Sequence, residues 1–161
     1  MLFRSGFGRD CYGQDDEGLE AVVGRLLRAR GLTVSVAESC TGGLVGHRLT
    51  NIAGSSAWVE RGVIVYSNRA KEQMLGVPEA LLRAHGAVSA PVAEAMVTGI
   101  CRISGSPCGL AVTGIAGPDG ATAEKPVGTV YVACAAPEGV EVKRHRFAGG
   151  RIGRASCRER V

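Results

Sequence analysis

Three short clusters of polar residues have the side-chain types needed for hydrolytic chemistry, and each follows a stretch that predicts a buried strand. They are residues 38–43, residues 66–71 and residues 113–118. In an open α/β sheet, ligands bind at the carboxyl ends of parallel strands, where the chain turns into the next helix. If the three strands are neighbours and run in the same direction, we expect the three clusters to line one crevice.

A serine and a lysine in these clusters suit a hydrolase that needs no metal ion. The Ser39 hydroxyl requires a base, and Lys71 could take the usual place of histidine if burial keeps its amine neutral. A Ser-His-Asp triad has no candidate, because the three histidines lie outside the clusters. Backbone N–H groups near Gly42 or Gly114 could donate to the negative oxygen of a tetrahedral intermediate.

Each cluster also has an ordinary structural interpretation. Residues 38–43 could be a simple strand-turn-helix with an N-cap, and Lys71 could be a solvated helix residue. Cys40 could act as the nucleophile instead of Ser39, although a thiol beside a turn is more often buried and inert. The clusters at residues 38–43 and 113–118 are rich in glycine, but neither has the P-loop or dinucleotide-binding pattern. The residues alone therefore indicate a domain that binds a small molecule or phosphate, with a Ser/Lys hydrolase as one interpretation.

The elements that must position these clusters alternate between strands and helices. Strands are predicted at 33–37, 58–66, 108–112, 127–135 and 140–147, and helices at 19–30, 44–52, 69–75, 78–83 and about 89–103. This order predicts an α/β fold, a three-layer α/β/α sandwich with a mixed sheet in a single domain. The last two strands are predicted to form a hairpin with an exposed edge.

Composition excludes several classes of function. Only 4% of the residues are aromatic, which leaves no base-stacking surface, and the net charge of +4 comes from a basic C-terminal end, so no nucleic-acid partner is predicted. No apolar run has the length of a membrane span and no signal leader opens the chain, which predicts no membrane partner and a cytoplasmic location. The six cysteines and three histidines lack metal-ligand spacing, so we expect free thiols and no metal.

The two ends of the chain do not fit the domain pattern. Residues 1–14 show no periodicity and are predicted to be a disordered or foreign leader, so the domain is expected to span residues 15–151. Residues 152–161 are an atypical tail without an apolar face, which predicts that a final helix covering the sheet has been lost. An uncovered sheet edge favours a homo-oligomer.

The motifs resemble those of the CinA C-terminal domain family, which includes nicotinamide-mononucleotide deamidases. The matching stretches are residues 37–43, 52–57, 62–71, 85–89, 112–118 and 124–130. They occur in the family's order, from about Asp15 to Arg151. Several independent motifs at matching spacing are much more specific than a single glycine motif.

The resemblance implies an amidohydrolase that converts nicotinamide mononucleotide to nicotinic acid mononucleotide and ammonia, without metal or cofactor, in pyridine-nucleotide recycling. It implies that Ser39 is the nucleophile, Lys71 its base and Tyr66 a hydrogen-bonding partner. The small-molecule nucleotide would be bound by residues that line the site and contact its anionic groups. These are Thr41, Gly42, Gly43, Thr113, Gly114 and Arg151.

The chain departs from the family pattern near its C-terminal end. Gly150 stands where the family has aspartate, and every residue after Arg151 differs. The alternative function is therefore a catalytically inactive module for nucleotide binding or regulation. Such a module would be a fragment of a longer CinA protein, in which a nucleotide-binding domain precedes this one.

Overall fold

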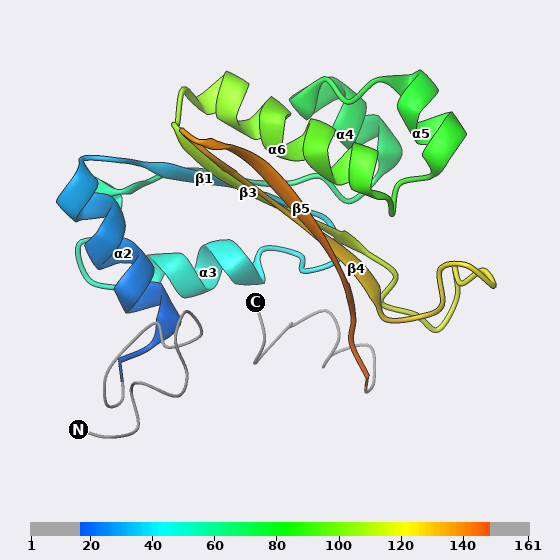
Figure 1. The fold of residues 1–161 in the computed structure, drawn as a ribbon, viewed down its shortest axis with the longest axis horizontal. Helices are drawn as coiled ribbons and strands as arrows, with labels where there is room; N and C mark the ends of the chain where they lie inside the picture. Colours follow the sequence, from blue (N-terminus) through cyan, green and yellow to red (C-terminus); the bar gives the residue numbers. More distant parts are fainter. Residues whose placement is uncertain (1–16, 149–161) are drawn as a thin grey trace.

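A computed structural model describes residues 17–148, which form a five-stranded mixed sheet between two layers of helices (Figure 1). The strands are β1 (Val34–Glu38), β2 (Val59–Ile64), β3 (Cys108–Gly114), β4 (Thr129–Ala136) and β5 (Gly139–Arg146). The helices are α2 (Leu19–Arg30), α3 (Leu44–Thr50), α4 (Asn68–Leu75), α5 (Glu79–His85) and α6 (Ala90–Ser104), with a short 3₁₀ turn at Ser55–Ala57. The predicted single α/β domain is confirmed.

Strand order in the sheet is β2-β1-β3-β4-β5. Strand β1 runs parallel to both β2 and β3, while β4 and β5 are antiparallel to their neighbours and form the predicted hairpin. Glu38, the last residue of β1, lies opposite Ile64 of β2 and Val112 of β3. The three parallel strands therefore end at nearly the same level, and the segments that follow them emerge together at one edge of the sheet.

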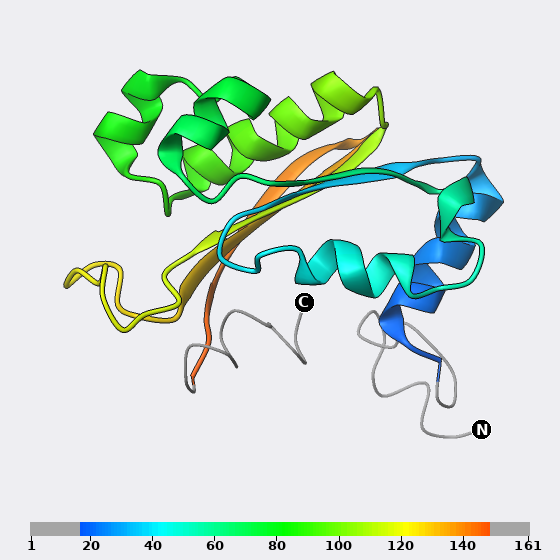
Figure 2. The ribbon, with the colours of Figure 1, turned by 180° about the vertical axis from the view of Figure 1, so that it is seen from behind.

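Helices cover the two faces of the sheet in separate groups, as Figures 1 and 2 show from opposite sides. Helices α4, α5 and α6 lie over one face, and α2 and α3 lie over the other. The long helix α6 forms the centre of the first layer, because Val92, Met96 and Ile100 are buried at helical spacing and pack in a core with Ala111 and Ala133 of the sheet. A smaller core on the second face is built around Trp58.

A close approach between α4 and α6 depends on one glycine. A Cβ atom at Gly99 of α6 would lie 2.3 Å from the carbonyl oxygen of Leu75, the last residue of α4. Only glycine leaves room for this contact, so α4 packs tightly on α6. Through this contact the core determines where α4 presents its inner side chains.

An apolar cavity of ≈ 340 Å³ lies on the second face, between helices α2 and α3 and strands β3 and β4.

The predicted leader, the predicted tail and the predicted loss of a final helix all lie outside residues 17–148. Within that range no helix has both the length and the apolar character needed to cross a membrane.

Candidate active site

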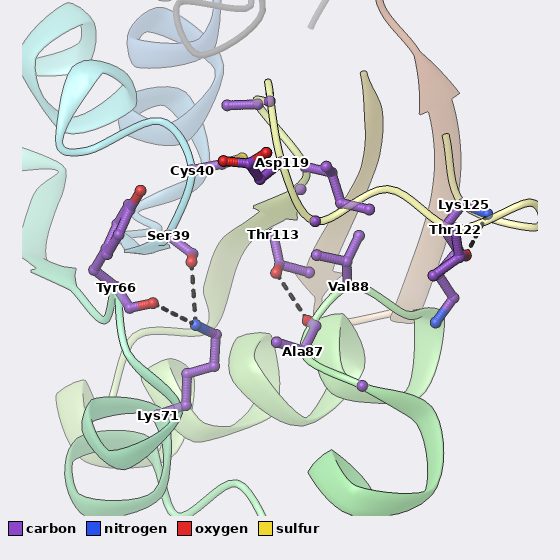
Figure 3. Close-up of a pocket in the computed structure, with 16 residues that line it drawn as sticks. Ser39, Cys40, Tyr66, Lys71, Ala87, Val88, Thr113, Asp119, Thr122 and Lys125 are labelled. Carbon is purple, nitrogen blue, oxygen red and sulfur yellow. Dashed lines mark hydrogen bonds between the residues drawn. The ribbon is translucent and has the colours of Figure 1, made fainter. Parts of the chain in front are cut away.

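The predicted serine and lysine meet beneath the edge where the parallel strands end (Figure 3). Lys71 Nζ lies 3.1 Å from Ser39 Oγ, although the two residues are 32 positions apart in the chain. Two backbone carbonyl oxygens complete the surroundings of the amine, Val65 O at 2.8 Å and Tyr66 O at 3.2 Å. Lys71 is only 1% exposed and Ser39 only 7%.

Helix α4 directs Lys71 inward because of how the helix begins and where it packs. Ser67 is the N-cap, and its hydroxyl oxygen accepts the N–H of Ala70 at 3.0 Å. Lys71 and Leu75 are four residues apart and therefore share one helix face, and both are buried. Since Leu75 is fixed in the core against Gly99, Lys71 is carried toward the end of strand β1.

Burial changes the acid–base behaviour of this lysine. Removal from water lowers the pKa of Lys71 below its ordinary value of 10.5, and a smaller effect of the Cys40 thiol acts in the opposite direction. Within residues 17–148, no carboxylate forms an ion pair with the amine. The neutral amine is thus more accessible at ordinary pH than in a solvated lysine.

The three oxygen neighbours of the amine can be satisfied in either protonation state, because a protonated amine donates one N–H to each of them, including Ser39 Oγ. A neutral amine has two N–H donors and one lone pair, and the carbonyl oxygens of Val65 and Tyr66 can only accept hydrogen bonds. When both N–H groups donate to these carbonyls, the lone pair is left for the Ser39 hydroxyl. This is the geometry required for Lys71 to take a proton from Ser39.

Ser39 lies in a turn that is held by the preceding residue, Glu38. The Glu38 carboxylate is 2% exposed and accepts the N–H groups of Gly43 (3.0 Å), Val45 (3.1 Å) and Gly46 (2.8 Å) at the start of α3. An acidic side chain is favourable there because the N–H groups of a helix start are unpaired and carry partial positive charge. Glu38 thereby links the end of β1, which precedes Ser39, to the start of α3, which follows it.

This arrangement bears on the expected substrate contacts of Thr41, Gly42 and Gly43. None of the three is among the described residues that line the pocket, and the N–H groups of Gly42 and Gly43 donate to Ser39 O and to Glu38. Both glycines have positive φ, 62° and 102°, which a tight turn requires. The N–H groups of Gly42 and Gly43 already have acceptors within the chain and are not available to an anionic group of the substrate, whereas the role of Thr41 stays a prediction.

Replacing Glu38 with alanine is expected to lower the free energy of unfolding by about 2–4 kcal/mol, because three N–H groups lose a charged acceptor. Glu38→Gln keeps one acceptor oxygen in the same shape and should lose roughly half as much. Urea unfolding of the two variants and the wild type measures this order. An equal loss in both variants, or none in either, would contradict the capping role.

The pocket above Ser39 is a cavity of ≈ 440 Å³ that draws on all three clusters, as predicted (Figure 3). The cluster residues that line it are Ser39, Cys40, Tyr66, Lys71 and residues 113–117. The Thr113 hydroxyl donates to the carbonyl oxygen of Ala87 at 2.9 Å and so ties the end of β3 to the connector before α6. A Cβ at Gly114 would lie 3.0 Å from the Cys40 sulfur, so glycine permits β3 to approach the turn.

The other predicted site residues are Tyr66, Gly114 and Arg151. Tyr66 lines the pocket and is 60% exposed, and its backbone carbonyl oxygen accepts a hydrogen bond from Lys71 Nζ. Of the two glycines considered as donors to an oxyanion, Gly42 donates its N–H to Ser39 O, while Gly114 lines the pocket. Arg151 lies outside the described residues.

Sequence reasoning missed two charged residues of the pocket, Asp119 and Lys125. Both belong to the long loop between β3 and β4 and lie beyond the cluster at residues 113–118. The signal was present, since Lys125 falls within one of the motif stretches, residues 124–130. What was missing was a reason to expect this part of the loop to fold over the strand ends.

Comparison with known proteins gives a consistent family assignment. The CinA C-terminal domain family matches residues 16–160. A CinA-like protein of Geobacter sulfurreducens is 53% identical over 150 residues, covering 93% of this chain and 36% of the relative. A CinA-like protein of Syntrophobacter fumaroxidans is 57% identical over 139 residues, covering 86% of this chain and 33% of the relative. The chain thus spans about a third of the length of these curated relatives.

Solved structures show the same fold. The competence/damage inducible protein CihA from Agrobacterium tumefaciens superposes with a TM-score of 0.83 at 43% identity, covering 90% of this chain and 92% of that one. The competence damage-inducible protein A from Klebsiella pneumoniae gives a TM-score of 0.82 at 37% identity, with 86% of each chain covered. The whole described domain, and not only the site, is therefore similar to these proteins.

Proposed function

Since the chain belongs to the CinA C-terminal domain family, we propose that it is an amidohydrolase that converts nicotinamide mononucleotide to nicotinic acid mononucleotide and ammonia. The observation that carries this proposal is the 3.1 Å contact between Lys71 Nζ and Ser39 Oγ at the floor of a pocket. A buried amine whose other two neighbours are carbonyl oxygens is suited to act as a base toward a hydroxyl.

In the proposed reaction, Ser39 Oγ attacks the carboxamide carbon while its proton passes to the lone pair of Lys71. The resulting ammonium donates a proton to the nitrogen of the tetrahedral intermediate, the C–N bond breaks and ammonia leaves. Water then attacks the acyl-enzyme ester with Lys71 again as base, which releases the carboxylate product and restores the Ser39 hydroxyl. The protein atoms return to their starting state.

Incubation of the purified chain with nicotinamide mononucleotide tests this proposal. We expect ammonia and nicotinic acid mononucleotide to form in equal amounts, measured by a coupled ammonia assay and by chromatography of the nucleotide. A boiled sample and a sample without enzyme control for spontaneous hydrolysis. A folded chain that binds the nucleotide but releases no ammonia would contradict the enzyme proposal.

The second candidate function is a binding or regulatory module without turnover. The chain spans about a third of the length of its curated relatives, so similarity to them does not by itself assign turnover to this chain. Calorimetry separates the candidates, because a module of this kind would bind the nucleotide with saturable heat in the absence of ammonia release. Such a result would mean that the pocket binds the nucleotide without hydrolysing it.

A further inference from the structure

Lys125 reaches the pocket from the far end of the β3–β4 loop and is held there by three hydrogen bonds. Its ammonium donates to the carbonyl oxygen of His85 at 2.7 Å. Its backbone N–H donates to the Thr122 hydroxyl at 3.0 Å, and its carbonyl oxygen accepts the Thr122 N–H at 3.0 Å. The loop turn and the end of α5 thus hold the half-buried side chain in place before any ligand arrives.

Among the charged residues that line the pocket, Lys125 is the candidate for binding an anion. The charged residues among the described lining are Lys71, Asp119 and Lys125. The hydrogen bonds of Lys71 go to Ser39 and two carbonyl oxygens, and a lysine that serves as base must be neutral. A protonated lysine has three N–H donors, and His85 O takes one of those on Lys125.

The position of Lys125 fits one end of an extended ligand. Figure 3 shows Lys125 across the pocket from Ser39, Tyr66 and Lys71, with Thr113 and Val88 between the two groups. In a nucleotide that presents its carboxamide to Ser39, the phosphate lies at the opposite end of the molecule. Lysine is a common phosphate ligand in proteins and acts as a point charge.

We infer that Lys125 binds the anionic group of the substrate and makes the pocket selective for a phosphorylated nucleotide over the matching nucleoside. The inference rests on the proposed function for the identity of the carboxamide end. It assigns Lys125 a binding role only, so its loss should weaken substrate binding and leave the proton transfers at Ser39 unchanged.

The test compares nicotinamide mononucleotide with nicotinamide riboside, which lacks the phosphate. In Lys125→Met we expect kcat/KM for the mononucleotide to fall about 10–100-fold, mainly through KM, because a charged hydrogen bond is lost. The value for the riboside should change less than about threefold. Lys143→Met is the matched control, since Lys143 is exposed on β5, pairs with Glu141 and does not line the pocket; it removes the same charge and should alter neither value.

Binding measurements keep this inference separate from the proposed reaction. Calorimetry on Ser39→Ala and on Ser39→Ala/Lys125→Met measures affinity for both ligands without turnover. A selective loss of mononucleotide affinity supports the role of Lys125 even if the wild type releases no ammonia. Equal losses for both ligands, or an affinity of Ser39→Ala for the mononucleotide no higher than for the riboside, would overturn it. Lys125→Arg should restore most of the selectivity, which a merely structural role of the side chain would not predict.

Discussion

Replacing Ser39 with alanine is expected to lower ammonia release from nicotinamide mononucleotide by at least about 10⁴-fold, because the proposed mechanism has no other route to the acyl-enzyme. The substitution removes a single oxygen atom. The backbone N–H of Ser39 still donates to Val112 O, and Glu38 still caps α3, so the turn should keep its shape. Steady-state kinetics measures the loss, and circular dichroism with thermal unfolding checks that the variant is folded.

Cys40 provides the control for this experiment, because its thiol lines the same pocket one residue away. If Ser39 is the nucleophile, Cys40→Ala should keep turnover within about tenfold of the wild type, since it removes no atom of the proposed proton path. Iodoacetamide should then fail to abolish the activity of Cys40→Ala, in which no thiol is left to be alkylated at this position of the pocket. The opposite pair of results, an active Ser39→Ala and an inactive Cys40→Ala, would transfer the nucleophilic role to the thiol.

Replacing Lys71 with arginine is expected to reduce kcat by about 10³-fold or more, although arginine preserves the positive charge and the donors. Arginine is not deprotonated in proteins and cannot accept the Ser39 proton. Lys71→Met should be equally inactive. Retained activity in Lys71→Arg would mean that Lys71 serves as a fixed charge and not as a base.

The pH dependence of the wild type follows from the same residue. Because burial lowers the pKa of Lys71 below 10.5, kcat/KM should rise with pH as the amine loses its proton and should level off above that lowered pKa. The assignment would be contradicted if kcat/KM did not rise with pH anywhere below 10.5, or if it fell in the range where this rise is expected. The profile is measured with the mononucleotide at concentrations well below KM.

Stability should also depend on pH through this lysine, in a direction that can be worked out. Between the lowered pKa of the folded state and 10.5, the unfolded chain binds more protons than the folded chain, so the free energy of unfolding rises with pH. Below that range both states are protonated and the cost of the buried charge is present in full. Lys71→Met removes this titration. The wild type should gain stability relative to Lys71→Met as pH rises, by up to about 1.4 kcal/mol per pH unit.

Much of the local structure followed from the sequence. Each described strand and helix occurs within about two residues of its prediction, because apolar periodicity and glycine turns are properties of short segments. The prediction that three clusters share a crevice was also correct, since each cluster follows a strand and parallel strands end together. These conclusions needed no distance between remote residues.

The helix start at residues 43–46 shows where that reasoning failed. Small polar residues after a strand suggest an anion site, but in the structure the buried carboxylate of Glu38 occupies the N–H groups. The sequence displayed Glu38 without indicating whether its side chain would face solvent or the turn. That choice depends on the packing of α3 against β1, which is not a local property.

The sequence by itself determined the order of elements, the chemical types available at the strand ends and the resemblance to a family. Only the tertiary structure decided that Lys71 is buried and in contact with Ser39, and that Lys125 reaches the same pocket. The physical reason is that a pKa and a hydrogen bond depend on solvent exclusion and on distances between segments that are remote in sequence. For Lys71 both are set by the tight packing of α4 on α6 and by the parallel pairing of β1 with β2.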